Sequence, residues 1–377
     1  MGKWTNSPRR IVDHKEILFR DVCQVVREYA FVTSELPLIV SLEVHCTPLQ
    51  QAAMVDITEE IWGEFLLPVP ELDPASLASP EQLRRKNLVK VKYVPNDKDG
   101  AESVNEGFDD DGSSILEVTT TEGGEKKAAK VKPPKVISRL SRLGIYTRGI
   151  TFKSLEQAEV SMPNHIFSLS EKAAFAIRRR MPKALFTHNR DFLMRTYPQG
   201  MRVDSSNFDP VIFRRAGVQV VALNWQSWDV GMILNEGMFA GSDGYVLKPN
   251  GYRRRGPTGE SEEDDMGSNI ESKKLDRVTV TPDALTAMTS KSTGTSPNFG
   301  GEVIEFLNVE GVVPELAFLS FIVMNDVLGP DVMTAWACVR LDRLRLGYRF
   351  VRLLDKDSMP SKGILLIKTV MTEAGVA

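Results

Sequence analysis

Residues 16–67 combine a helix pattern, a short buried strand and a second helix, and this order constrains the fold more than any other feature. Residues 16–31 carry apolar side chains at helical spacing, and Pro37 introduces the short apolar run LIVSLE. Thr47 then stands at the N-cap position of a further helix, with Pro48 in its first turn. Alternating helices and buried strands are typical of an α/β layer or barrel, so we expect that fold class.

The composition changes sharply over residues 95–135, where an acidic, Gly/Ser-rich stretch is followed by a basic, Pro-containing one. Such a segment buries too little apolar area to offset chain entropy, so we predict a disordered linker. Residues 253–275 form a second polar linker by the same criterion. Between the two, residues 166–181 indicate a strand that leads into a helix capped by Ser170.

Short apolar runs continue through the rest of the chain. Residues 217–225 predict a buried strand and residues 244–249 a short one. From Arg277 onward, strand-like runs separated by turn residues indicate a small β-sandwich; they are RVTVT, EVIEF, LAFLSFIVM and ILLIKTVM.

Composition also excludes several classes of protein. A formal net charge of −3 argues against a dedicated nucleic-acid binder. Cys23, Cys46 and Cys338 lie far apart without a CxxC pair, which is typical of a reduced intracellular protein and excludes a cysteine zinc site. The first residues lack a secretory signal, and the longest apolar runs have only the length of a strand. We therefore expect a cytoplasmic protein without a transmembrane segment, whose membrane contact is peripheral.

Two sets of charged residues stand at strand positions. Glu43 stands at the C-terminal end of the run LIVSLE, where a carboxylate could act as a base or metal ligand, although an exposed acid at a strand end gives the same pattern. Lys90 and Lys92 point to one face of an extended segment. They could hold a phosphate, or they could protect a solvated edge strand from aggregation.

Arg195 and Tyr197 share a face if their segment is extended. An arginine suits bidentate contact with a phosphate, and a tyrosine ring can pack on a sugar-like ring. The alternative is a packed core aromatic beside a surface arginine.

The run RVDSSNFDPVIFRRAGVQVVALNWQSWD, followed by GYVLKP, strongly resembles the Y half of the catalytic barrel in eukaryotic phosphoinositide-specific phospholipases C. Upstream, YAFVTSELPLIVSLEVHCTPLQQ and SPEQLRRKNLVKVK resemble the second half of the X region. VPELAFLSFIVMND and LRLGYRFVRLLD resemble late strands of the family's C2 domain. The expected domains are a partial X region (1–94), an X–Y linker (95–135), the Y region (136–252), a linker (253–275) and a partial C2-like domain (276–377).

This resemblance implies an incomplete TIM barrel followed by a β-sandwich, and cleavage of phosphatidylinositol 4,5-bisphosphate to diacylglycerol and inositol 1,4,5-trisphosphate with Ca²⁺. It implies that Glu43 is a calcium ligand, that Lys90, Lys92 and Ser168 contact phosphates, and that Arg195 and Tyr197 hold the inositol ring. His14 matches the second catalytic histidine, or is an ordinary surface histidine.

The same resemblance places the first catalytic histidine and an adjoining asparagine calcium ligand upstream of the residues that match. It places the family's glutamate and aspartate calcium ligands just ahead of Trp4, where this sequence has neither acid. The segment after His14 is shorter than in the family. In the C2-like region, the candidate calcium-loop acids are Asp326 and Asp331, which are more often ordinary loop residues. Two hypotheses follow: a phospholipase C whose sequence is incomplete, or a catalytically inactive phosphoinositide-binding or scaffold protein derived from that family.

Overall fold

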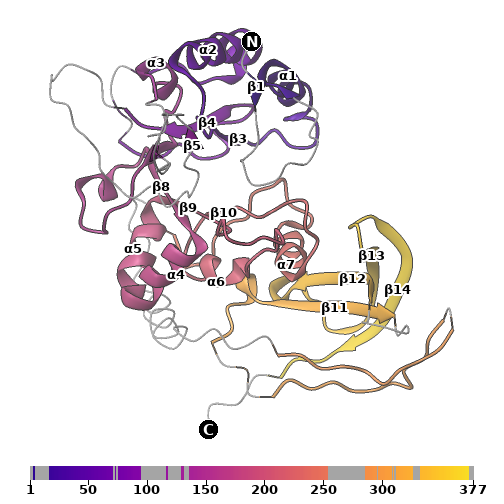
Figure 1. Cartoon of the computed structure of the whole chain (residues 1–377). Helices are drawn as coiled ribbons and strands as arrows, with labels where there is room; N and C mark the ends of the chain where they lie inside the picture. The colour runs from indigo at the N-terminus through magenta and orange to yellow at the C-terminus, as the bar shows by residue number, and fades with distance from the viewer. Residues whose placement is uncertain are drawn as a thin grey trace, which may run out of the picture. The chain divides into compact units, whose positions relative to one another are not determined.

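The computed structural model describes part of the chain, in two compact units (Figure 1). The described residues are 3–4, 17–70, 73, 75–94, 116–117, 129–130, 136–253, 285–294, 296–307, 309, 311–325 and 332–372. The first unit lies within 1–208, 216–226 and 239–246, and the second within 209–215, 227–238 and 247–377. His14, Asp326, Asp331, the run RVTVT and most of both predicted linkers lie outside the described residues.

A curled, fully parallel sheet forms the centre of the first unit and gives it the form of a partial TIM barrel. Its six strands lie in the order β10-β9-β8-β7-β4-β3. They are β3 (Leu38–Ser41), β4 (Asn87–Lys92), β7 (Arg148–Ile150), β8 (His165–Ser170), β9 (Leu193–Tyr197) and β10 (Val220–Val221). The α/β class predicted from the sequence is therefore confirmed.

Helices and two short strand pairs complete this unit. The helices are α1 (Phe19–Tyr29), α2 (Pro48–Trp62), α3 (Ser138–Ser141), α4 (Glu171–Arg180) and α5 (Pro182–Asp191), with 3₁₀ turns at Gly63–Phe65 and Ala158–Ser161. The pairs are β1 (Lys3–Trp4) with β2 (Ile17–Leu18), and β5 (Leu116–Glu117) with β6 (Ala129–Lys130). The second pair falls within the predicted linker of residues 95–135.

The predicted helix caps are confirmed. Thr47 accepts a hydrogen bond from the Gln50 backbone, the Gln50 side chain accepts one from the Thr47 backbone, and Pro48 stands in the first turn of α2. Ser170 accepts a hydrogen bond from the Ala173 backbone at the start of α4. Because Ser170 also ends β8, one residue joins the strand to its helix without an intervening loop.

The predicted helix of residues 16–31 is wrong at its start. The structure begins α1 at Phe19, since Ile17 and Leu18 pair with β1 instead. Phe19 and Cys23 of α1 are buried, and the Trp62 indole donates a hydrogen bond of 2.9 Å to the Cys23 carbonyl. This bond joins α1 to α2 within the core of the first unit.

Three strand predictions are wrong in whole or in part. Of residues 217–225 only Val220 and Val221 form a strand, because the Asn224 amide beyond them donates to the Asn207 side chain instead of continuing the ladder. Residues 244–249 form no strand, and the Tyr245 hydroxyl donates to the Pro37 carbonyl. Residues 302–306 are also irregular, with the Glu302 carboxylate accepting from the Ser290 amide and hydroxyl.

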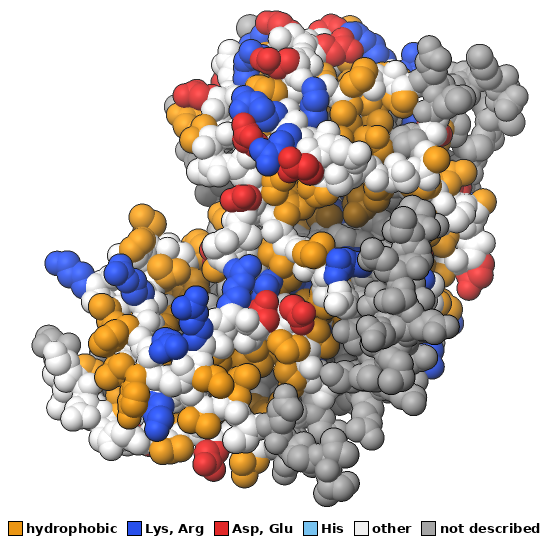
Figure 2. Space-filling view, turned by 180° about the vertical axis from the view of Figure 1, so that it is seen from behind, with side chains coloured by type: hydrophobic (Ala, Val, Ile, Leu, Met, Phe, Trp, Pro, Cys, Tyr) orange, Lys and Arg blue, Asp and Glu red, His pale blue; other side chains and the backbone are white. Residues whose placement is uncertain are grey.

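The second unit combines helices with an antiparallel sheet of four strands in the order β11-β12-β13-β14. The elements are α6 (Pro210–Arg214), most of α7 (Val230–Phe239), β11 (Phe318–Asn325), β12 (Val332–Arg340), β13 (Gly347–Asp355) and β14 (Pro360–Thr369), with 3₁₀ turns at Pro314–Leu316 and Leu341–Arg343. The strands predicted over 316–324 and 364–371 are present, and the sheet agrees with the expected C2-like domain. Figure 2 shows hydrophobic and cationic side chains intermixed over its β13–β14 part.

Gly237 lets α7 lie directly against this sheet. A Cβ atom added to Gly237 would stand 2.5 Å from Cys338 Sγ and 3.0 Å from Cys338 Cβ. We expect Gly237→Ala to lower the free energy of unfolding by about 1–2 kcal/mol, because the cost of overpacking exceeds the gain in helix propensity. Urea unfolding measures the change. Adding Cys338→Ala removes the nearer atom and should restore part of the loss, whereas an unchanged stability of Gly237→Ala would contradict the close packing.

Candidate functional site

The residues singled out from the sequence lie at one edge of the parallel sheet. Lys92 ends β4, Tyr197 ends β9, and Glu43 lies two residues beyond the end of β3. Ser168 and Arg195 stand two residues before the ends of β8 and β9. Because parallel strands present their carboxyl ends at the same edge, four strands contribute to one region, the edge where ligands bind in α/β folds.

Strand register places these side chains on the same face as well. Lys92 pairs with Gly149 of β7, which pairs with Ile166 of β8. Ser168 lies two residues past Ile166, and it pairs with Arg195. Since paired residues of parallel strands point to one side and alternation repeats every two residues, Lys90, Lys92, Ser168, Arg195 and Tyr197 share a face.

The opposite face of the sheet is packed. Val91 and Phe167 are each 1% exposed and Met194 is fully buried. The ring of His188, from α5, lies 5.4 Å from the Phe167 ring, between centroids. The helices therefore cover that face, which leaves the face carrying the two lysines and Arg195 as the inner face of the curled sheet.

Two details of the inner face suit a ligand with phosphate groups. The Arg195 guanidinium carbon lies 4.8 Å from the centroid of the Tyr197 ring, which orients the guanidinium plane. The Ser168 hydroxyl oxygen is buried and has no hydrogen-bond partner among the described residues. Buried hydroxyls are normally paired, so a ligand oxygen at this point would satisfy Ser168.

Glu171 and Arg202 hold the loop that follows β9, and sequence reasoning missed both. The Arg202 guanidinium donates to both Glu171 carboxylate oxygens, at 2.5 and 2.7 Å, and the Gln199 amide donates to the same carboxylate at 2.9 Å. Burial alone would raise the pKa of Glu171, but the hydrogen bonds from Arg202 and Gln199 outweigh it and lower the pKa below its usual range. Glu171 thus remains ionised at neutral pH and fixes the loop next to Tyr197.

A calcium site does not follow from the described residues. They contain no group of three or more His, Cys, Asp or Glu side chains arranged to hold a metal ion. Glu43 is exposed and contributes a single carboxylate, whereas Ca²⁺ takes six to eight oxygen ligands. The part of the chain that the structure describes therefore does not fit the ion by itself.

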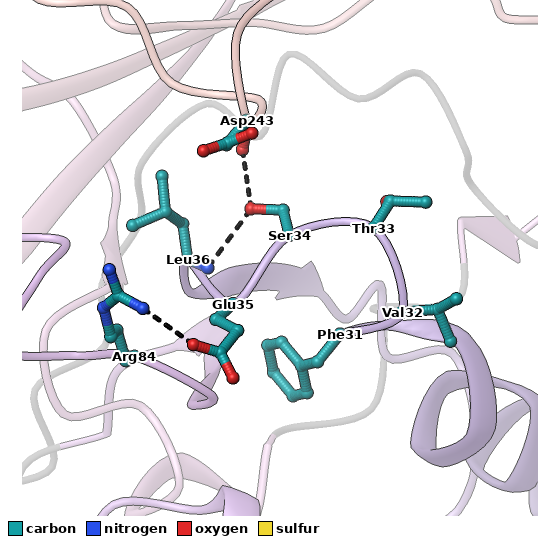
Figure 3. Close-up of a pocket in the computed structure, with 8 residues that line it drawn as sticks. All are labelled: Phe31, Val32, Thr33, Ser34, Glu35, Leu36, Arg84 and Asp243. Atoms are coloured by element: carbon teal, nitrogen blue, oxygen red, sulfur yellow. Dashed lines mark hydrogen bonds and ion pairs between the residues drawn. The ribbon is translucent and has the colours of Figure 1, made fainter.

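A small polar pocket lies elsewhere in the first unit, before the start of β3 (Figure 3). Its volume is about 270 Å³, and residues 31–36, Arg84 and Asp243 line it. Arg84 pairs with Glu35 at 2.7 Å, and the Ser34 hydroxyl donates to the Asp243 carbonyl at 2.8 Å. Because this pocket is at the amino end of β3, it is separate from the candidate site.

Comparison with protein families finds two matches along the chain. The model "Phosphatidylinositol-specific phospholipase C, X domain" matches residues 9–93, and the corresponding Y-domain model matches residues 140–251. The chain belongs to the phosphatidylinositol-specific phospholipase C family.

Individual relatives agree with this assignment. The chain is 37% identical to 1-phosphatidylinositol 4,5-bisphosphate phosphodiesterase 1 of Candida albicans over 66% of the chain and 26% of that protein. It is 36% identical to the human phosphodiesterase zeta-1 (63% of the chain, 40% of the relative) and 29% identical to the Xenopus laevis phosphodiesterase delta-4 (91% and 50%). The crystal structure of PLC21 from L. pealei superimposes with a TM-score of 0.70 at 26% identity, over 96% of this chain and 49% of the other.

The chain thus spans between about a quarter and a half of the length of these relatives. Among the residues that the structure describes, no helix combines the length and the apolar character needed to span a bilayer.

Proposed function

We propose that this chain carries the headgroup-binding part of a phosphoinositide phospholipase C, which hydrolyses phosphatidylinositol 4,5-bisphosphate to diacylglycerol and inositol 1,4,5-trisphosphate in intracellular signalling. The observation that carries the proposal is the gathering of Lys90, Lys92, Ser168, Arg195 and Tyr197 on one face at the carboxyl ends of the barrel strands. Relatives named as phosphodiesterases of this lipid support the choice of substrate.

The proposal divides the tasks among these residues, with the two lysines sharing one. The Arg195 guanidinium donates two parallel hydrogen bonds to one phosphate, and Lys90 and Lys92 attract a second phosphate as point charges. The Ser168 hydroxyl donates to a phosphate oxygen, while Tyr197 packs against the apolar face of the inositol ring. Together they would orient the phosphodiester toward the reacting groups.

Glu43 is the residue that we propose as a calcium ligand. Glu43 would supply one oxygen of the calcium shell, and because the described residues do not fit the ion by themselves, the other ligands would have to come from elsewhere in the protein. His14 would be the acid that protonates the departing diacylglycerol oxygen. Both roles rest on the family resemblance.

A second candidate is a phosphoinositide-binding protein without hydrolytic activity. It is favoured by the described part of the site, where the cationic side chains of a headgroup pocket are present and Glu43 is the one residue proposed to bind metal; the proposed acid His14 lies outside the described residues. In either case we place the protein in the cytoplasm, bound peripherally to the inner surface of a membrane.

Vesicles that contain phosphatidylinositol 4,5-bisphosphate separate these functions. The hydrolytic function predicts release of inositol trisphosphate in Ca²⁺ that is lost in Glu43→Gln. Both functions predict that Lys90→Ala/Lys92→Ala reduces vesicle binding. Binding without release at any Ca²⁺ concentration establishes the non-hydrolytic candidate. Equal binding of phosphatidylinositol and its bisphosphate by the 377-residue chain would contradict both candidates.

A further inference from the structure

One face of the β13–β14 hairpin is apolar, cationic and open to solvent. Tyr348 and Phe350 of β13 are 66% and 75% exposed, and Ile364 and Leu366 of β14 are 57% and 61% exposed. The register pairs Phe350 with Leu366, and Tyr348 with Lys368. Paired residues of antiparallel strands lie on the same side, so these side chains form one continuous surface, here called the hairpin face.

Cations surround the apolar part of the hairpin face. Arg352 pairs with Ile364, and Lys362 lies two residues before Ile364. With Lys368 they make three cations on this face, and all three are exposed. The Lys368 ammonium lies 5.4 Å from the centroid of the Tyr348 ring. From Tyr348 to Arg352 and from Lys362 to Lys368, the alternation places no aspartate or glutamate on this side.

The hairpin face is not the core side of the sheet. Leu353, on the opposite side, is only 5% exposed, and its neighbours Val351, Leu365 and Ile367 are half-buried. On the same side as the hairpin face, α7 covers β12, where Gly237 meets Cys338. The apolar residues of β13 and β14 therefore extend beyond the part of the sheet that this helix protects.

We propose that the hairpin face binds an anionic lipid bilayer. Its cations complement acidic phospholipid headgroups, while Tyr348 and Phe350 have the aromatic character of residues at membrane interfaces. The lysine stems can lie along the apolar surface with their ammonium groups at headgroup level.

Edge protection and self-association each account for less of this surface than a bilayer does. Lysines protect an edge strand such as β14 from aggregation, but that role requires neither Phe350 nor Leu366. Docking of a second copy through a two-fold axis would bring the same uncompensated cations together across the interface. A bilayer satisfies both the apolar and the charged part.

Sedimentation with phosphatidylcholine vesicles, with and without phosphatidylserine, tests this proposal. The vesicles contain no phosphoinositide and the buffer contains a calcium chelator, so the result is independent of the proposed headgroup site. We expect binding only in the presence of phosphatidylserine. Lys362→Ala/Lys368→Ala should weaken it about 25-fold, at roughly fivefold per cation near the membrane surface.

Variants of the apolar side chains and a matched control complete the design. Phe350→Ala/Leu366→Ala should weaken vesicle binding about tenfold or more, because the variant no longer buries these two apolar side chains in the membrane interface. Lys356→Ala is the control, since Lys356 is exposed on the hairpin turn and paired with Asp357 at 2.6 Å; it should bind as wild type. Wild-type binding by both double variants would overturn the proposal. So would a dimer in sedimentation equilibrium that Phe350→Ala/Leu366→Ala dissociates.

Discussion

Arg195→Ala is expected to weaken binding of inositol 1,4,5-trisphosphate about 100-fold. Hydrogen bonds to charged groups contribute about 1.5–3 kcal/mol, and about 1.4 kcal/mol corresponds to a factor of ten in affinity. The substitution removes the guanidinium that lies over Tyr197 in register with Ser168. Titration calorimetry measures the loss directly, and Arg195→Lys should recover only part of it because an ammonium cannot make the bidentate contact.

The control for this measurement is another arginine of the same unit. Arg190 is exposed near the end of α5 and pairs with its neighbour Asp191 at 3.4 Å. Arg190→Ala should leave the affinity unchanged. Equal losses in Arg190→Ala and Arg195→Ala would mean that the general charge of the surface attracts the ligand, and the assigned role of Arg195 would then be wrong.

Glu171→Ala is expected to lower the free energy of unfolding by about 2 kcal/mol at neutral pH and to weaken headgroup binding as well. The Glu171 carboxylate accepts hydrogen bonds from Arg202 and from the Gln199 amide. Its removal takes this acceptor away from both donors in a partly buried loop, which costs stability. Urea unfolding and calorimetry give the two effects. Because Glu171 acts through the loop, Glu171→Gln should keep more of the stability than Glu171→Ala.

The stabilisation by Glu171 should depend on pH with a definite sign. Its pKa is lowered in the folded protein, so the stabilisation is complete above the pKa of the unfolded chain, about 4.3. It is lost as the pH falls through the folded pKa. The difference in stability between wild type and Glu171→Ala should therefore be constant near neutral pH and shrink in the acid range below about pH 4. A difference that persists unchanged there would contradict the ionised pair with Arg202.

The sequence predicts the single elements of the site better than their arrangement. Alternation over NLVKVK and over LMRTY was enough to place Lys90 with Lys92, and Arg195 with Tyr197, on strand faces. It could not show that β7 lies between β4 and β8 and aligns Lys92 with Ile166, because register depends on the whole sheet. Family resemblance, and no local pattern, pointed to Ser168.

Long-range pairs account for the residues that were missed. Glu171 and Arg202 are separated by a helix pair and a strand, and either alone has the pattern of a surface charge. The false strand at 244–249 has a related cause, since its apolar pattern suits a strand but the Tyr245 hydroxyl binds the Pro37 carbonyl far away in sequence. The run ILLIKTVM was enough to predict β14 as a strand, but which of its faces remains open depends on where α7 packs.

Hydrogen–deuterium exchange of the whole chain, with and without inositol 1,4,5-trisphosphate, tests the central claim most directly. We predict that the ligand slows exchange at the carboxyl ends of β4, β8 and β9 and in the loop of residues 198–207, with little change over β11–β14. Slower exchange confined to the pocket before β3, or no change at ligand concentrations that saturate binding, would contradict the assignment of the headgroup site.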